Sequence, residues 1–286
     1  MKITLDPGHG YKQNLGLNGY YESTGNLRAC KLLKAELEKY GFEVAMTRTE
    51  DNQDPDISTQ RGQVAARNGS KVFISWHSDA NANASVRGVT AIRSLQRPDS
   101  VDLGQKLASA VAGVMGTPLS PYAGNDKGVW TRVYPGTTNT DYYAVIRNSV
   151  PAGSAVEHSF LIEHGFHTNQ QDVDKLDNEG WRLKIVQAEA KVLAEYFGMA
   201  GGTEPPEPTE PPAVDGLHHV QVGAFKSKAN ADAYAVKLKK AGFQTLVKKE
   251  GDFYRVQVGA FKSEASAKAY VDTVKTAGFD AIVVKG

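Results

Sequence analysis

Three short segments of the sequence contain residues that could bind a metal ion or transfer a proton. They are Asp6-Pro7-Gly8-His9-Gly10, Ser75-Trp76-His77-Ser78-Asp79 and Leu161-Ile162-Glu163-His164-Gly165-Phe166. Each follows or contains an apolar run typical of a β-strand, so His9, His77 and Glu163 should lie at or just beyond strand ends. With Glu22 they supply two histidines and two glutamates. A catalytic zinc needs three such ligands and an open fourth position, and a nearby carboxylate can accept a proton.

Taken singly, these residues have simpler explanations. Glycines on both sides of His9 allow a sharp turn, but a turn histidine need not bind anything. Glu22 opens a predicted helix, where a carboxylate is commonly a favourable charge in the first turn. His77 could be an ordinary histidine at a strand end. Glu163 is different, because a carboxylate in an apolar stretch is costly to bury without a partner, and a cationic site would provide one.

The elements that must position these residues alternate along the first two thirds of the chain. Strands are predicted at 2–6, 42–48, 71–77, 88–94 and 159–163, and helices at 22–40, 57–68, 100–115 and 179–198. Such alternation predicts an α/β fold with a mostly parallel sheet flanked by helices. Sites in these sheets form at the carboxyl ends of strands, so the four residues can meet although they are far apart in sequence.

A proline-rich segment predicts that the chain has two parts. Residues 201–212 hold five of the 12 prolines and no large apolar residue, which predicts a stiff extended linker over 201–215. Downstream, residues 220–227 (VQVGAFKS) recur as residues 256–263 at a spacing of 36. Each repeat has a strand, a helix, a glycine turn and a second strand. Two repeats predict a small α+β domain with the order β-α-β-β-α-β over 216–286.

The first part, residues 1–200, resembles the zinc-dependent N-acetylmuramoyl-L-alanine amidases of the amidase_3 type. Four motifs carry the resemblance: the DPGHG of 6–10, the helix start ESTGNL of 22–27, the SWHSDA of 75–80 and the EHGFHTN of 163–169. The resemblance implies that His9, Glu22 and His77 bind Zn²⁺ and that Glu163 is catalytic. It also implies hydrolysis of the bond between the lactyl group of N-acetylmuramic acid and the L-alanine of the peptidoglycan stem peptide.

The sequence departs from the family pattern just before Glu163. Residues 153–158 form an insertion between Pro151-Ala152 and the catalytic motif, and they offer Glu157 as a second carboxylate. Only Glu163 has the Gly-Phe context, so it is the preferred base. His158, His164 and His167 also cluster here. One of them could help to hold an oxyanion, but surface positions are the expectation.

The second part, residues 216–286, resembles a SPOR domain, a module that binds peptidoglycan glycan. Alternation within VQVGAF places valine and alanine on one face and glutamine, glycine and phenylalanine on the other. Gln221, Tyr254 and Gln257 are therefore predicted sugar contacts on an exposed face. This part carries twelve basic and six acidic residues, whereas the remainder of the chain has an excess of acidic residues. The excess of positive charge suggests a separate partner, although lysines on solvated helices would have the same effect.

Together these observations predict a modular cell-wall hydrolase whose partner is bacterial peptidoglycan, with no nucleic-acid and no membrane partner. A zinc peptidase cutting within the stem peptide and a catalytically dead wall-binding protein remain alternatives. The first residues pass directly into the DPGHG motif without a hydrophobic leader, so we expect synthesis in a cytoplasm and action on the wall after release. A phage endolysin and the autolysin of a sporulating cell both fit that expectation, and the compact two-module organisation slightly favours the endolysin.

Overall fold

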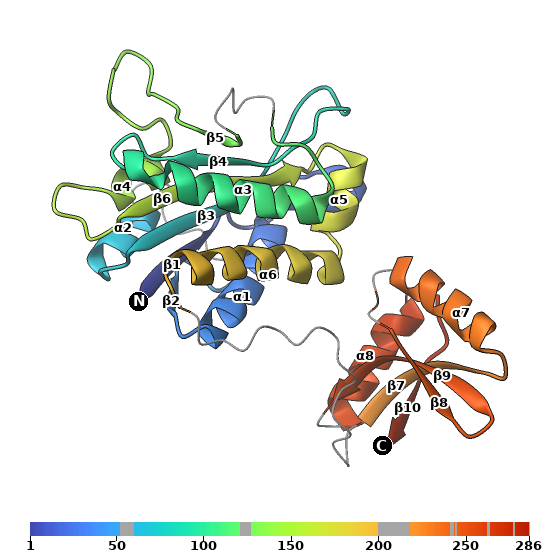
Figure 1. Ribbon diagram of the computed structural model, residues 1–286. Helices are drawn as coiled ribbons and strands as arrows, with labels where there is room; N and C mark the ends of the chain where they lie inside the picture. The colour runs from blue at the N-terminus through green and yellow to red at the C-terminus, as the bar shows by residue number, and fades with distance from the viewer. Residues whose placement is uncertain are drawn as a thin grey trace. The chain divides into compact units, whose positions relative to one another are not determined.

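The computed structural model describes residues 1–51, 60–120, 127–199, 218–240, 243, 245–261, 264–276 and 278–285. The chain divides into two compact units, Met1–Thr203 and Glu204–Gly286, each with its own core (Figure 1). The predicted linker at 201–215 lies outside the described residues, so its conformation stays a prediction.

The first unit contains a six-stranded sheet in the order β2-β1-β3-β6-β4-β5. Its strands are β1 (Lys2–Pro7), β2 (Glu43–Met46), β3 (Val72–Asp79), β4 (Thr90–Arg93), β5 (Val129–Trp130) and β6 (His158–Phe166). The strands β2, β1, β3 and β6 are parallel to one another, β4 is antiparallel to β6, and β5 is parallel to β4. The predicted α/β fold with a mostly parallel sheet is confirmed. The reversal of β4 follows from its short connection to β3, because a parallel return requires a crossover, usually a helix.

Helices cover both faces of this sheet (Figure 1). They are α1 (Glu22–Lys39), α2 (Gln60–Arg67), α3 (Val101–Met115), α4 (Ala144–Ser149), α5 (Gln170–Leu176) and α6 (Glu179–Tyr196), with 3₁₀ turns η1 (Leu17–Gly19) and η2 (Pro98–Ser100). Alternate residues of β3 separate the two cores. Ile74 packs in the large cluster that includes buried residues of α1, α3 and α6, whereas Phe73 packs with Ala65 of α2 on the other face.

The second unit contains β7 (His218–Phe225), α7 (Lys228–Lys240), β8 (Leu246–Glu250), β9 (Phe253–Phe261), α8 (Glu264–Thr276) and β10 (Ile282–Lys285). Its four strands form an antiparallel sheet in the order β10-β7-β9-β8. The predicted order β-α-β-β-α-β is confirmed. Small residues of both helices, including Ala231 and Ala267, pack against the valines of β7 and β9.

The predicted alternation within the repeat holds for the valines, which lie in the core, but not for the residues after them, because register shifts interrupt β7 and β9 where they pair. Ala224 is exposed although it was expected on the core face. Gln221 pairs with Gln257, and Val222 and Val258 are the extra residues beside that pair. Beyond the shift Phe225 packs against the core instead of facing solvent. Gln221 and Gln257 are buried, with 8% and 7% of their surface exposed, so they do not lie on an exposed face as expected. A β-bulge changes which face the following side chains occupy, and the sequence pattern alone does not show it.

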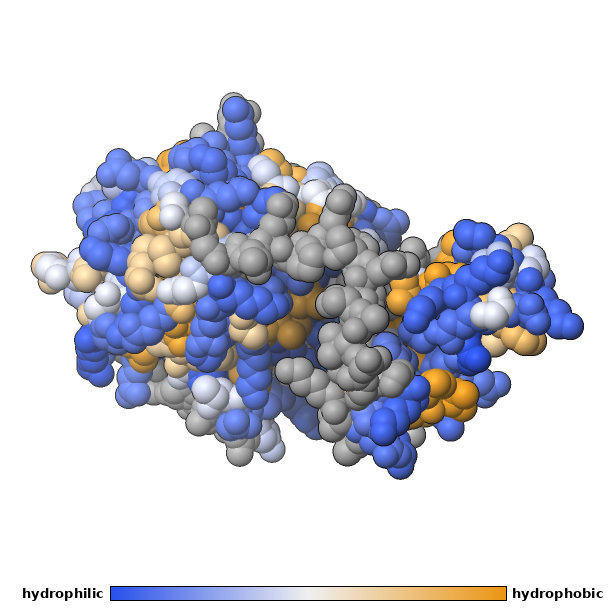
Figure 2. Space-filling view, turned by 60° about the horizontal axis from the view of Figure 1, so that its bottom comes forward, coloured by the Kyte–Doolittle hydropathy of each residue, from blue (hydrophilic) through white to orange (hydrophobic). Residues whose placement is uncertain are grey.

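The surface is mainly hydrophilic, as expected for a chain with 23% charged residues. Hydrophilic residues cover most of the face of the first unit seen in Figure 2, and the orange areas there are small. In the second unit Val236, Phe253 and Ile282 are exposed apolar residues. Within the described part of the chain, no helix combines the length and the apolar character needed to cross a membrane.

The contact between α2 and α4 predicts opposite effects for two glycine substitutions. A Cβ at Gly62 would lie 2.2 Å from the carbonyl oxygen of Val145 and 2.7 Å from the amide nitrogen of Ser149, whereas a Cβ at Gly113 of α3 meets nothing within 4 Å. Gly62→Ala should therefore destabilise the first unit by about 1–3 kcal/mol through overpacking. Gly113→Ala should stabilise it by up to about 1 kcal/mol through helix propensity. Thermal unfolding of both variants measures this, and equal effects would contradict the described helix contact.

Candidate metal centre

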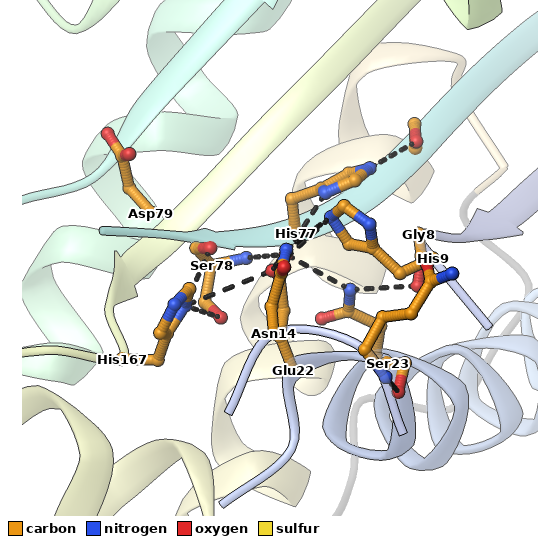
Figure 3. Close-up of polar contacts among 12 residues, drawn as sticks. Gly8, His9, Asn14, Glu22, Ser23, His77, Ser78, Asp79 and His167 are labelled. Atoms are coloured by element: carbon orange, nitrogen blue, oxygen red, sulfur yellow. Dashed lines mark hydrogen bonds and ion pairs between the residues drawn. The ribbon is translucent and has the colours of Figure 1, made fainter. Parts of the chain in front are cut away.

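Three of the predicted ligands meet at one point (Figure 3). His9 follows β1, Glu22 is the first residue of α1 and His77 lies near the end of β3. One ligand atom from each of the three lies within 4.8 Å of the others. His9 Nε2 is 3.3 Å from Glu22 Oε2, and His77 Nδ1 is 3.0 Å from Glu22 Oε1. The sequence prediction placed these residues together, and the structure does so as well.

The backbone between β1 and α1 is bent sharply to bring His9 to this point. His9, Tyr11, Lys12, Asn14 and Asn18 all have positive φ, between 42° and 59°. Such conformations cost free energy in residues other than glycine and persist where the surroundings impose them. The close approach at the neighbouring Gly8 has the same origin, since a Cβ there would lie 2.3 Å from the His77 ring.

Two buried arginines hold this bent segment. Arg48 donates through Nε to the carbonyl of Pro7 (2.9 Å) and through Nη2 to those of Gly8 (3.2 Å) and Ser23 (2.6 Å). Arg61 donates to the carbonyls of Pro7 (2.8 Å) and His9 (2.8 Å). Both side chains are almost fully buried, so the start of α1 and the end of β1 are joined through guanidinium groups that water does not reach.

Glu22 is buried but well supplied with hydrogen bonds. Its side chain accepts from Asn14 Nδ2 (2.7 Å), from the backbone N–H of Ser78 (3.0 Å) and from Asn26 Nδ2 (3.4 Å). Burial opposes ionisation of this carboxyl, but hydrogen bonds from His77 and His9 outweigh it and hold its pKa well below the usual range. Glu22 is therefore an anion that faces two imidazoles.

A short relay fixes which nitrogen of His77 is available. Ser75 Oγ donates its single proton to Asp6 Oδ2 (2.6 Å), so at the 3.1 Å contact it must accept from His77 Nε2–H. This leaves His77 Nδ1 to face Glu22 Oε1 at 3.0 Å. Two atoms with lone pairs at that distance need a proton or a metal ion between them. The donor set of two imidazoles and one carboxylate therefore fits a divalent metal such as zinc.

Glu163 lies beside this centre on the neighbouring strand. Its position on β6 pairs in register with His77 on the parallel strand β3, so both side chains point to the same face of the sheet. Glu163 Oε2 is buried without a hydrogen-bond partner among the described residues. Burial raises the pKa of this carboxyl well above its usual value, and the charges of Asp79 and Glu22 raise it further. A carboxylate with a raised pKa is suited to accept a proton and to return it.

The rival carboxylate lies elsewhere. Glu157 precedes β6, at the opposite end of the strand from the metal centre, and its exposed side chain pairs with Lys71. The insertion at 153–158 therefore does not bring a second base to the site.

The expectation that the nearby histidines lie on the surface is wrong, since His158, His164 and His167 are all buried. The ring of His164 stacks on Trp76 at 3.7 Å, its Nε2 lies 2.8 Å from Glu189 Oε1, and its Nδ1 lies 3.1 Å from the carbonyl oxygen of His77. Trp76 Nε1 donates to the same Glu189 carboxylate (3.1 Å). This group supports the backbone of the ligand His77 from the far face of the sheet.

His167 closes another side of the site. Its Nδ1 donates to the carbonyl of Ser78 (3.0 Å) and lies 3.9 Å from Glu22 Oε2. Sequence reasoning did not find Asn14, Ser75 with Asp6, or Glu189. For Ser75 a signal exists, since alternation along β3 puts it on the same face as His77. For Asn14 and Glu189 the sequence shows none.

A pair of histidines and a glutamate around one point, with an unpaired carboxylate beside it, defines the class of metal-dependent hydrolases. Comparison with known families gives the particular one. Residues 3–195 match the N-acetylmuramoyl-L-alanine amidase family, and residues 215–285 match the SPOR domain. Because the first match covers more than half of the chain, the protein belongs to the N-acetylmuramoyl-L-alanine amidase family. It is a peptidoglycan amidase with a wall-binding SPOR module.

Individual relatives are distant but similar in length. The sporulation-specific N-acetylmuramoyl-L-alanine amidase of Bacillus subtilis is 29% identical over 251 residues, which is 86% of this chain and 84% of that protein. The amidase CwlM of Bacillus licheniformis is 28% identical over 254 residues, with the same coverage of 86% and 84%.

Solved structures agree on the fold of the first unit. The catalytic domain of CwlV from Bacillus (Paenibacillus) polymyxa superposes with a TM-score of 0.55 at 22% identity, over 69% of this chain and 98% of that one. Ami1 from Mycobacterium smegmatis gives a TM-score of 0.57 at 21% identity, over 69% and 97% of the two chains.

The unpaired Glu163 predicts a pH-dependent stability difference in the metal-free protein. Its folded-state pKa is raised, so its burial costs free energy above that pKa and nothing below the unfolded value of about 4.3. Glu163→Gln should therefore raise the unfolding temperature at pH 8, and this gain should shrink as the pH falls through the raised pKa. The exposed Glu157→Gln is the matched control and should show no such gain. A loss of stability in Glu163→Gln at pH 8 would contradict the unpaired environment.

Proposed function

We propose that the amidase reaction uses a zinc ion held by His9, Glu22 and His77, with Glu163 as general base and acid. The observation that carries this proposal is the convergence of the three ligand atoms within 4.8 Å, with Glu163 in register beside them. Two histidines and one glutamate form a known catalytic zinc set that leaves a position open. When bound, zinc would polarise the lactyl carbonyl and lower the pKa of the attacking water.

Residues of the chain itself would position the metal ligands and transfer the proton. Asp6 and Ser75 hold His77 with Nδ1 free, and Arg48 and Arg61 hold the segment that carries His9. The Glu163 carboxylate accepts the proton of the attacking water and later donates it to the amine of the departing stem peptide. Its raised pKa favours that return, and a bound cation would offset part of the shift.

Two substitutions should separate metal binding from proton transfer. Glu22→Gln removes a ligand and should weaken zinc binding by at least about 100-fold, the upper range for residues that only support ligands. Glu163→Gln should retain about one zinc per chain but lose about 10²-fold to 10⁴-fold or more in activity, because an amide cannot accept the proton.

Zinc content by elemental analysis and mass spectrometry of digested wall measure both effects, with exposed Glu157→Gln as the control. The wild-type products should be intact stem peptides that begin with L-alanine. A fully active Glu163→Gln variant would refute the assigned base. Less than half an equivalent of zinc in the loaded wild type would refute the metal site.

We also propose how the SPOR module contacts glycan. Among the predicted contacts, Tyr254 on β9 pairs with Phe225 and packs against the same core. Its side chain is only half-buried, with Lys249 5.8 Å from its ring centre, so its exposed part could meet a sugar. Gln221 instead accepts a hydrogen bond from Arg255 Nη1 (2.9 Å), and Arg255 also pairs with Glu250 (2.8 Å). Gln221 and Gln257 would therefore support the sheet face, and Tyr254 would contact the ligand.

This assignment predicts how wall binding responds to salt and mutation. The second unit has its own core, so residues 213–286 should fold alone and sediment with purified peptidoglycan. Binding through its excess positive charge should fall with salt, since the Debye length is about 8 Å at physiological ionic strength, whereas sugar contacts should persist. Tyr254→Ala should weaken the binding that persists, and Val236→Ala on α7 should not. Binding that vanishes at high salt would leave only electrostatic attraction.

The biological setting is proposed from the relatives. The similarity to a sporulation-specific amidase extends over 86% of this chain, beyond the catalytic unit alone. This favours a lytic role in a sporulating cell, with action on the wall after release, over the phage endolysin that the sequence slightly favoured.

A further inference from the structure

The segment between β5 and α4 is an ordered projection. Residues 131–143 stand out from the sheet at the upper left of Figure 1. The segment folds back on itself, with Val133 bridged to Asp141 and the amide of Tyr142 bonded to the carbonyl of Arg132 (2.8 Å). At its base the buried Asp141 carboxylate accepts from Ser94 Oγ (2.7 Å) and from the amide of Leu95 (2.7 Å). The projection is therefore fixed to the core.

Strand periodicity places Tyr143, the last residue of this segment, on the same face of the sheet as Glu163. Leu161 and Glu163 are two residues apart on β6, so their side chains point to the same face of the sheet. On that face Leu161 packs with Ile92 and Ile146, and Tyr143 packs against the same cluster. Burial raises the pKa of the Tyr143 hydroxyl, and the charge of Glu163 adds to that rise, so the two groups are within electrostatic reach.

Arg132 is a cation held in place by two tyrosines of this projection. Its guanidinium lies 3.7 Å from the ring centre of Tyr142, and its Nη1 donates to the hydroxyl of Tyr143 (3.3 Å). Arg132 is exposed, and among the described residues no carboxylate lies within 4.0 Å of its guanidinium. Stacking and the hydrogen bond restrict the side chain and leave most of its five N–H groups available to a ligand.

The negative charge around the reacting bond suggests that this cation binds an anionic group of the substrate. The carboxyl groups of Asp79 and Glu163 lie within electrostatic reach of Tyr143, and when ionised they would repel an anionic substrate. The glutamate after L-alanine in the stem peptide is linked through its side chain, so its α-carboxyl group is an anion where it is free and neutral where it is amidated. Arginine binds carboxylates through two parallel hydrogen bonds.

We propose that Arg132, held by Tyr142 and Tyr143, forms a subsite for a free carboxylate of the stem peptide next to the scissile amide. The inference rests on the proposed function, since Glu163 marks the position of that bond. It makes Arg132 a specificity-determining residue that separates stems with free carboxylates from amidated ones.

The test compares two substrates and two arginine variants of the full-length, zinc-loaded protein. Purified peptidoglycan is digested before and after its carboxyl groups are converted to amides, by the wild type, Arg132→Ala and Arg132→Lys. Arg67→Ala is the matched control, because this exposed arginine ends α2 at the amino-end edge of the strands, away from the site. The ratio of kcat/KM between the two walls, compared between variants, cancels any effect of amidation on the SPOR module.

The wild type and Arg67→Ala should prefer the native wall by roughly fivefold to tenfold, mainly through KM, as expected for a partly exposed charge pair. Arg132→Ala should lose this preference while keeping its zinc and its activity on the amidated wall, and Arg132→Lys should retain part of it. Equal rates of the wild type on both walls, or an Arg132→Ala variant that keeps the preference, would overturn the subsite.

Failure of the wild type on both walls would instead contradict the proposed function. Two synthetic muramoyl dipeptides, ending in glutamate or in its α-carboxamide, identify which carboxylate is read. A preference between them assigns the subsite to the second residue of the stem, and a preference seen only on the wall assigns it to a carboxylate further along.

Discussion

The buried carboxylate of Glu22 is the constraint on which the rest of the catalytic unit depends. An anion with 1% of its surface exposed must be surrounded by donors or cations, and no single element of the fold can supply them. His9 comes from the end of β1, His77 and the amide of Ser78 come from β3, and Asn14 comes from the strained segment between β1 and α1. The sheet and the first helix therefore have to meet at this point.

The supporting residues act on position and protonation rather than on the chemistry itself. Arg48 and Arg61 bind backbone carbonyls of the bent segment, and Asp6 acts through Ser75 to fix the free nitrogen of His77. Glu163 differs from Glu22 in its hydrogen bonding, because one of its oxygens has no partner among the described residues. Buried groups without partners reduce stability, and proteins retain them where function requires a perturbed pKa.

Much of this arrangement could be predicted from sequence, for physical reasons. The strands β1, β3 and β6 are apolar runs, and each brings a chemically active residue to one edge of the sheet, so the meeting of His9, His77 and Glu163 followed from topology. The long amphipathic helices α1, α3 and α6 were also found. The short elements β5, α4 and α5 were missed, because two to seven residues are too few for a periodic pattern.

Other features depend on tertiary structure and left no pattern. The burial of His164 requires Glu189, which lies 25 residues away on α6, so local polarity suggested a surface position. The bulges at Val222 and Val258 change which face the following residues occupy, and the burial of Gln221 accompanies its hydrogen bond to Arg255 of the neighbouring strand. The orientation of Arg132 depends on rings that approach it only after the projection has folded back.

The most direct test of the account is a crystal structure of the zinc-loaded protein with anomalous diffraction measured on both sides of the zinc absorption edge. The account predicts one anomalous peak in the catalytic unit, bound by the side chains of His9, Glu22 and His77, with His77 using Nδ1 while Nε2 keeps its contact with Ser75. A peak on other residues, or a His77 that binds through Nε2, would contradict it.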